Sequence, residues 1–332
     1  MNRAHAILAR PAIALLVVMS MMPAIASAQT RIKPGFNLFS PEQDVQVGQQ
    51  SAQQAEQQLP ILRNSEVESY VNAIGQKLAK NAGGPNFPYS FKVVNASDIN
   101  AFALPGGPIY INRGVLEQAH NEGEVAGVIA HEISHVALRH GTHQASKAYA
   151  AQMGISILGG LLGGKVGGGA ADIINAVGGL GLNALFLKYS RDLESQADVR
   201  GAQILAATGY SPNDMVSFFQ TLEKADTSKK TSWLSDHPAP PDRIRRIQQE
   251  AQVLQVNGSP TTNVAQLQSV QSRLKSSGPA LTAQQIAQGV QSQPSSGTSA
   301  RRRSSGGAQP QTVNVEAPST SLATYTSPSR IY

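Results

Sequence analysis

The chain of 332 residues has no cysteine, little charge and few aromatic side chains. Without cysteine it can form no disulfide, carry no thiol nucleophile and receive no lipid on a cysteine thiol. Charged residues make up 14% of the chain, against roughly 25% in an average soluble protein. The 41% hydrophobic content is still enough for a globular protein of one or two domains, which excludes disorder throughout.

The surplus of basic residues, a net charge of +6, is confined to the two ends. Residues 1–28 contain two of the 27 Lys and Arg and no acid, and residues 251–332 contain six bases and one acid. This leaves 19 bases and 20 acids between residues 29 and 250, so that part lacks the basic surface of a nucleic-acid-binding domain. We therefore expect no nucleic-acid partner. We interpret residues 301–303, three arginines, as a solvated tail, the alternative being attraction to anionic lipid or cell wall.

The first 28 residues have the pattern of a secretory signal peptide. Arg3 and Arg10 precede an apolar run over residues 12–25, which ends in Ala26-Ser27-Ala28. The run has about 14 residues, whereas a membrane-spanning helix needs roughly 20, so a membrane anchor is the less favoured alternative. We expect cleavage near Ala28 and an exported mature chain that is held together by core packing and by any bound metal.

Residues 40–112 combine helical and strand-like patterns. Ser40, followed by proline, opens a polar surface helix that reaches Gln58, and apolar residues at helical spacing predict a second helix over 67–78. We therefore predict a mainly helical α+β fold with a small sheet. Strand-like segments are expected at residues 89–95, 101–104 and 109–111.

Two regions differ in composition from the expected domain of residues 29–255. Residues 150–187 form a glycine-rich apolar insert whose uncharged runs are too short to span a membrane. We interpret the insert as a buried or mobile helical hairpin, the alternative being a surface that contacts the envelope membrane or a membrane protein. From residue 256 to 332 the Ser, Gln, Pro and Gly content predicts a low-complexity, largely disordered tail, apart from one amphipathic helix at 264–274.

Residues 131–135 read His-Glu-Ile-Ser-His within an amphipathic helix that we expect to run from Asn121 to Gly141. Residues four apart on a helix share a face, so His131 and His135 can bind one metal ion. Glu132 lies about 100° further around the helix and can reach a metal-bound water. The pattern predicts one Zn²⁺ per chain.

A catalytic zinc needs three protein ligands and one open position. His140 and His143 do not fit the extended motif His-x-x-Gly-x-x-His, so we interpret them as residues at the helix end or beside the ligands. Glu194 and Asp198 are again four apart, on a second long helix that we expect over residues 183–208. Glu194 is then the candidate third ligand, and Asp198 accepts a hydrogen bond from a ligand histidine. On spacing alone, a solvated charged cluster is the alternative.

Four short segments carry a family resemblance. They are residues 100–107 (Asn-Ala-Phe-Ala-Leu-Pro-Gly-Gly), 131–135, 194–198 with Gly201, and 236–238 with Arg243-Ile244. In this order they resemble the HtpX and CaaX-prenyl-protease family of gluzincin zinc metallopeptidases, especially its soluble periplasmic, BepA-like branch. Only the zinc motif is specific on its own. The chain departs from that branch because it has no recognisable repeat of about 34 residues, so functions tied to those repeats are not implied.

The resemblance implies a zincin-like domain with Glu194 as the third ligand. It places Asp198 beside the site, either next to a ligand or as a proton donor. His237 would stabilise the oxyanion or approach the zinc as a removable fourth ligand, the alternative being a loop histidine without such a role. An edge strand offers free backbone groups to an extended peptide of any sequence. The resemblance implies that this strand consists of Asn100, Ala101, Phe102, Ala103 and Leu104.

We therefore expect a periplasmic zinc endopeptidase that hydrolyses extended or unfolded polypeptides, such as misassembled envelope proteins. Glu132 would take a proton from the zinc-bound water and pass it to the leaving amine. The alternative is a zinc-containing chaperone or assembly factor that holds envelope proteins in the same groove and cleaves them little. Membrane association through the insert is compatible with both.

Overall fold

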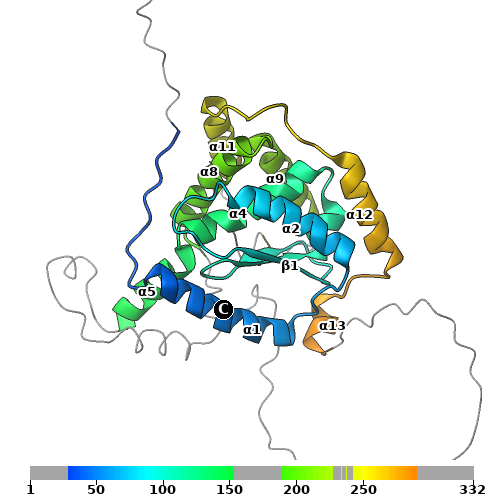
Figure 1. Ribbon diagram of the computed structural model, residues 1–332, viewed down its shortest axis with the longest axis horizontal. Coiled ribbons are helices and arrows are strands. Elements are labelled where there is room, and N and C mark those ends of the chain that lie inside the picture. The colour runs from blue at the N-terminus through cyan, green and yellow to red at the C-terminus, as the bar shows by residue number, and fades with distance from the viewer. Residues whose placement is uncertain (1–28, 153–188, 227–232, 234–236, 238–241, 290–332) are drawn as a thin grey trace, which may run out of the picture.

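The computed structural model describes residues 29–152, 189–226, 233, 237 and 242–289 (Figure 1). Over these residues the predicted α+β fold, mainly helical with one small sheet, is confirmed. The elements in chain order are α1 (Pro41–Gln58), α2 (Ser65–Ala79), β1 (Ser90–Val94), β2 (Ala101–Ala103), β3 (Pro108–Asn112), α3 (Arg113–Gln118), α4 (Glu122–Ala137), α5 (His140–Gln152), α8 (Arg191–Ala207), α9 (Pro212–Asp226), α11 (Asp242–Val253), α12 (Val264–Ser276) and α13 (Ala283–Ala287).

The three strands are ordered β1-β3-β2. β1 runs parallel to β3, with Phe91 opposite Ile109, and β2 runs antiparallel to β3, with Phe102 opposite Tyr110. β2 is therefore an edge strand, and no strand among the described residues pairs with its outer side.

Each face of the sheet carries its own core, because neighbouring residues of a strand point to opposite faces. Ile109 and Ile111 belong to the large core that includes α2 and α4, whereas Tyr110 between them belongs to a smaller core with Val47 of α1. Figure 1 shows the corresponding layers, with α1 below the sheet and α2 and α4 above it. The upper layer is the one that carries the zinc motif.

Helix α4 and helix α8 approach closely enough to share a buried site. The side chain of Asn121 caps α4 by accepting a hydrogen bond from the backbone of Glu124, and Ser190 caps α8 in the same way. A Cβ on Gly201 of α8 would lie 3.4 Å from the backbone nitrogen of His131 and 2.6 Å from the side chain of Met215. The distance to α4 is an ordinary van der Waals contact, so the glycine chiefly leaves room for the Met215 side chain of α9 beside it.

Two expected helix boundaries are wrong. α4 ends at Ala137, because Arg139 adopts a left-handed backbone with φ 60° and a new helix, α5, starts at His140. Gly141, the expected end, lies inside α5. The second long helix does not include Tyr189 and Ser190, since the extended Ser190 is the cap from which α8 starts.

The folded part also extends beyond the expected boundary after residue 255. The amphipathic helix expected at 264–274 is confirmed as α12, which buries Leu267, Val270 and Leu274. Arg113, buried on α3, donates to the carbonyls of Leu274 and Gly278 at 2.8 and 2.7 Å and so anchors the segment that follows α12. The tail composition predicts solvent exposure, but the apolar stripe of α12 packs on the domain.

Several predictions lie outside the described residues: the signal peptide of residues 1–28, residues 153–187 of the glycine-rich insert, and residues 290–332 of the tail. Within the described part, no helix is both long and apolar enough to cross a membrane.

Candidate metal centre

Helix α4 supplies the first two candidate ligands. The Nε2 atoms of His131 and His135, one turn apart, lie 3.0 Å from each other. These side chains and that of Glu132 are 0%, 2% and 1% exposed, so none of them is solvated from the surface. Uncompensated polar groups are costly at such burial, which predicts partners inside the protein.

The first turn of α8 brings Glu194 to this pair. Its Oε2 lies 3.4 Å from Nε2 of His131, and its Oε1 lies 3.6 Å from Nε2 of His135. Glu194 is fully buried. Two neutral imidazole nitrogens and one carboxylate oxygen form a donor set that suits Zn²⁺.

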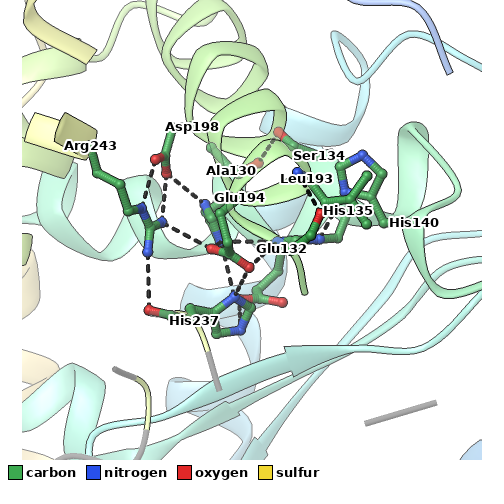
Figure 2. A network of polar contacts seen from close by, with 12 residues as sticks. Ala130, Glu132, Ser134, His135, His140, Leu193, Glu194, Asp198, His237 and Arg243 are labelled. Carbon is green, nitrogen blue, oxygen red and sulfur yellow. Dashed lines mark hydrogen bonds and ion pairs between the residues drawn. The ribbon is translucent and has the colours of Figure 1, made fainter. Parts of the chain in front are cut away.

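His237 reaches the same point from a separate segment of the chain. Its Nδ1 lies 3.3 Å from Nε2 of His131 and 2.9 Å from Oε1 of Glu194. Figure 2 shows His135, Glu194 and His237 converging from three segments of the chain. One potential ligand atom from each of His131, His135, Glu194 and His237 lies within 4.8 Å of the other three.

These spacings match the geometry of a tetrahedral zinc site. With zinc–nitrogen and zinc–oxygen distances of about 2.0–2.2 Å, two ligand atoms of a tetrahedron lie roughly 3.3–3.6 Å apart. Five contacts among the candidate ligand atoms, counting either oxygen of Glu194, range from 2.9 to 3.6 Å, and one atom from each of the four residues lies within 4.8 Å of the others. The cluster therefore has the size and the chemistry to hold one zinc ion.

The Nδ1 nitrogens of His131 and His135, which face away from the centre of the cluster, also have side-chain partners. Nδ1 of His131 lies 3.1 Å from Oδ1 of Asp198, and Nδ1 of His135 lies 3.0 Å from Nδ1 of His140. Arg243 donates two hydrogen bonds of 2.7 Å to Asp198 and a third, of 3.2 Å, to the carbonyl of His237 (Figure 2). Such contacts fix the orientation of an imidazole and leave Nε2 facing the centre.

Burial disfavours the charged form of each ionisable side chain in this cluster, and the neighbouring charges and hydrogen bonds decide in which direction its pKa shifts. Burial raises the pKa of Glu194, but His237 and His131 outweigh it and hold that pKa well below 4.5. Burial would lower the pKa of His131, but the hydrogen bonds with Asp198 and Glu194 raise it to about 9. For Glu132 burial dominates and raises the pKa of the carboxyl. The carboxylates thus favour a cation among them, a position that a metal ion suits.

Sequence reasoning missed three residues that pack around the cluster or brace it. Tyr189 stacks on His135 with ring centroids 4.0 Å apart, and Trp233 stacks on His237 at 4.7 Å. Neither residue has a spacing that would have pointed to the site. Arg243 was noted only as part of the family resemblance, and its contact with Asp198 depends on the packing of α11 against α8.

The structure brings together His131, Glu132, His135, Glu194, Asp198 and His237, and it places β2 beside α4. Among the other described histidines, His140 lies against Nδ1 of His135, whereas His120 and His143 lie apart from the ligand atoms. His143 contacts the carbonyl of Phe36, and His120 pairs with Glu124 at 3.1 Å. The individual roles of the clustered residues stay predictions.

Comparison with known proteins agrees with this geometry. Residues 65–251, more than half of the chain, match the model of peptidase family M48. The chain belongs to peptidase family M48. As a member of M48 it is a metallopeptidase, so the enzyme class and the family that the sequence predicted are confirmed.

Three relatives show how much of the chain is shared. The metalloprotease LoiP of Escherichia coli is 29% identical over 70% of this chain and 94% of its own length, and the metalloprotease YcaL is 32% identical over 55% and 72%. The beta-barrel assembly-enhancing protease of Yersinia pestis is 30% identical over 62% of this chain, but the match spans only 43% of that relative.

Proposed function

We propose that this M48 protein is an exported zinc endopeptidase that cleaves unfolded or misassembled envelope proteins. The observation that carries the proposal is the buried cluster of His131, His135, Glu194 and His237 with Glu132 beside it. Its ligand atoms lie within 4.8 Å of one another, and most of them are imidazole nitrogens, which suit zinc, whereas magnesium and calcium prefer oxygen ligands. One ion per chain would be held by His131, His135 and Glu194.

When bound, zinc polarises a peptide carbonyl and lowers the pKa of a coordinated water toward about 7. The protein supplies the proton transfer. Glu132 follows His131 on α4, and its Oε1 lies 3.6 Å from Nε2 of His237. Its carboxylate would accept a proton from the attacking water and pass it to the leaving amine, a role for which a raised pKa is favourable.

Asp198 and Arg243 support this chemistry through His131. Arg243 fixes both oxygens of Asp198, and Asp198 in turn lies against Nδ1 of His131. This arrangement favours the role of a positioning residue for Asp198 over that of a proton donor, because its carboxylate is already engaged by Arg243 and its pKa lies below the usual value.

His237 is proposed as a removable fourth ligand. Its Nδ1 lies 3.3 Å from Nε2 of His131 and 2.9 Å from Oε1 of Glu194, close enough to bind the same ion in place of the attacking water. Water and substrate would then gain access only when His237 moves away. In that moved position the same side chain could stabilise the oxyanion, so the two roles are successive states of one residue.

Substrate would bind as an added strand along β2. Asn112 donates to the carbonyl of Asn100, and Leu104 donates to the carbonyl of Pro108. In an antiparallel ladder every second residue points its backbone groups to the other side, so Ala103, next to the paired Leu104, directs its N–H and C=O away from β3. Such pairing selects extended peptides with little regard for sequence.

The envelope assignment rests on the name of the Y. pestis relative and on the leader-like residues 1–28. Periplasmic location, cleavage near Ala28, and contact of the insert with membrane components are parts of the same proposal. The composition of residues 29–250, with no excess of bases, supports a protein rather than a nucleic-acid substrate.

The test is cleavage of an unfolded outer-membrane β-barrel protein by the purified zinc-loaded chain. We expect cleavage to stop with chelator and to return with zinc. Glu132→Gln should keep its zinc and lose about 10²- to 10⁴-fold in rate, the usual contribution of a general base. A Glu132→Gln variant that cleaves at the wild-type rate would refute the mechanism. If this variant restores normal growth to cells that lack the protein, the result would instead favour the chaperone alternative.

A further inference from the structure

Helix α11, which carries Arg243, also carries a buried carboxylate that has no part in the proposed chemistry. Glu250 of α11 is 4% exposed. It accepts hydrogen bonds from the side-chain amide of Gln203 on α8 at 2.8 Å, and from the backbone N–H and the hydroxyl of Thr30 at 3.2 and 2.5 Å. Gln203 also donates to the carbonyl of Thr30 at 2.9 Å. Two helices and the N-terminal segment therefore meet at this carboxylate.

Within the part of the chain that the structure describes, no positive charge lies against Glu250. Asp198, the other buried carboxylate between α8 and α11, has the guanidinium of Arg243 at 2.7 Å. In the described part of the chain, by contrast, no lysine or arginine forms an ion pair with Glu250, and its donors there are neutral. A buried carboxylate without a cation is costly, so the site would be stabilised by an ammonium group at its edge.

The expected processing of the chain would create such an ammonium. Cleavage after Ala28 makes Gln29 the first residue, and its α-amino group then belongs to the residue before Thr30. Consecutive Cα atoms lie about 3.8 Å apart, so the new charge forms within one residue of the N–H that already contacts Glu250.

We propose that Glu250 and Gln203 form a binding site for the processed N-terminus of the chain, with the α-ammonium of Gln29 as its cation. The proposal depends on the expected removal of residues 1–28 and not on the peptidase reaction. Removal of the leader would thereby fasten α8 to α11 at a second point, in addition to the contact between Asp198 and Arg243.

The N-terminal segment continues from this site to the helix that follows the zinc motif. Figure 1 shows residues 29–40 running from the α11 end of the domain toward α5. There Asn37 donates to the hydroxyl of Thr142 at 2.8 Å, and the backbone of Leu38 donates to the hydroxyl of Ser146 at 2.9 Å. Docking at Glu250 would therefore connect helices on two sides of the metal centre.

The experiment compares two chain lengths in a double-mutant cycle. One form begins at position 29 with a free amine and is released from a fusion by a protease that leaves no extra residue. The other form retains Ser27-Ala28 in front of position 29. Both carry Gln29→Ala, which prevents cyclisation of the terminal glutamine, and each is made with and without Glu250→Gln. We expect the longer form to melt about 2–4 °C lower, and this difference to disappear with Glu250→Gln.

Glu223→Gln, at an exposed carboxylate of α9, is the matched control and should leave the length difference intact. The melting curves are recorded with zinc and with chelator, so that failure of the peptidase proposal leaves the result interpretable. Equal melting temperatures for the two lengths would overturn the proposal. So would a length difference that survives Glu250→Gln, because the ammonium would then act elsewhere.

Discussion

The two edges of the small sheet are treated differently by the rest of the chain. The outer edge of β1 is paired at its end, where Ile61 forms a bridge with Val94, and just beyond the strand Leu281 forms a bridge with Ala96. On the outer side of β2, no strand of the described residues pairs with the corresponding groups. β2 is also the strand that lies beside α4 and its zinc motif.

Unpaired edges are a liability, since they invite pairing with other chains, and proteins usually cover them. Here Ile61 pairs with the end of β1, and a segment more than 180 residues away in sequence, around Leu281, pairs with the residues just after it. Among the described residues, no strand pairs with the β2 edge next to the buried metal cluster, which agrees with the substrate binding proposed for this edge. The difference predicts that changes at the β1 edge act on stability and that changes at the β2 edge act on cleavage.

The largest effect is expected at the anchor of the β1 edge. Arg113→Met removes hydrogen bonds to the carbonyls of Leu274 and Gly278 and should lower the free energy of unfolding by about 2–4 kcal/mol, because buried acceptors lose their donors. Denaturant titration measures this. The matched control, Arg245→Met at an exposed arginine, should have little effect. Cleavage per folded molecule should not change, and a selective loss of activity would contradict the division between the edges.

The next effect is expected at the β2 edge. Ala103→Pro removes the N–H that is proposed to pair with substrate, and kcat/KM for an unfolded protein should fall about tenfold, the value of one hydrogen bond. Leu281→Pro is the counterpart, since it removes the 3.0 Å hydrogen bond to Asn95 at the β1 edge. It should lower the melting temperature and leave kcat/KM intact. Equal effects of both variants on cleavage would remove the functional distinction.

The smallest effect is expected from opening the metal centre. His237→Ala removes the proposed fourth ligand, so basal cleavage should rise several-fold, while zinc stays bound through three protein ligands. His143→Ala, whose histidine contacts the carbonyl of Phe36, is the control. Cleavage assays with metal analysis decide the outcome. A fall in cleavage at unchanged zinc content would contradict the removable-ligand role and favour oxyanion stabilisation alone.

The sequence predicted the parts of the site that follow from helical periodicity. His131, Glu132 and His135 lie within one turn, and Glu194 and Asp198 share a face of a capped helix, so their types and spacing carried the information. The pairing of α4 with α8 could not be deduced from either helix alone. It depends on tertiary packing, including the room that Gly201 leaves for Met215.

The remaining errors have local physical causes. The break after Ala137 arises because Arg139, in a left-handed conformation, is held by Asp44 and by the carbonyl of Phe39. No periodicity announces such a contact between residues 95 positions apart. Likewise, the helix at 264–274 was predicted, but the polar composition around its three buried residues concealed that it packs on the domain.

The most direct test of the central claim is zinc-edge X-ray absorption on the zinc-loaded resting protein. The account predicts four nitrogen and oxygen ligands at about 2.0–2.2 Å, with scattering from three imidazoles and one carboxylate. His237→Ala should reduce the imidazoles to two. A resting spectrum with one imidazole or none, or with six oxygen ligands, would contradict the assignment of His131, His135, Glu194 and His237 to the metal centre.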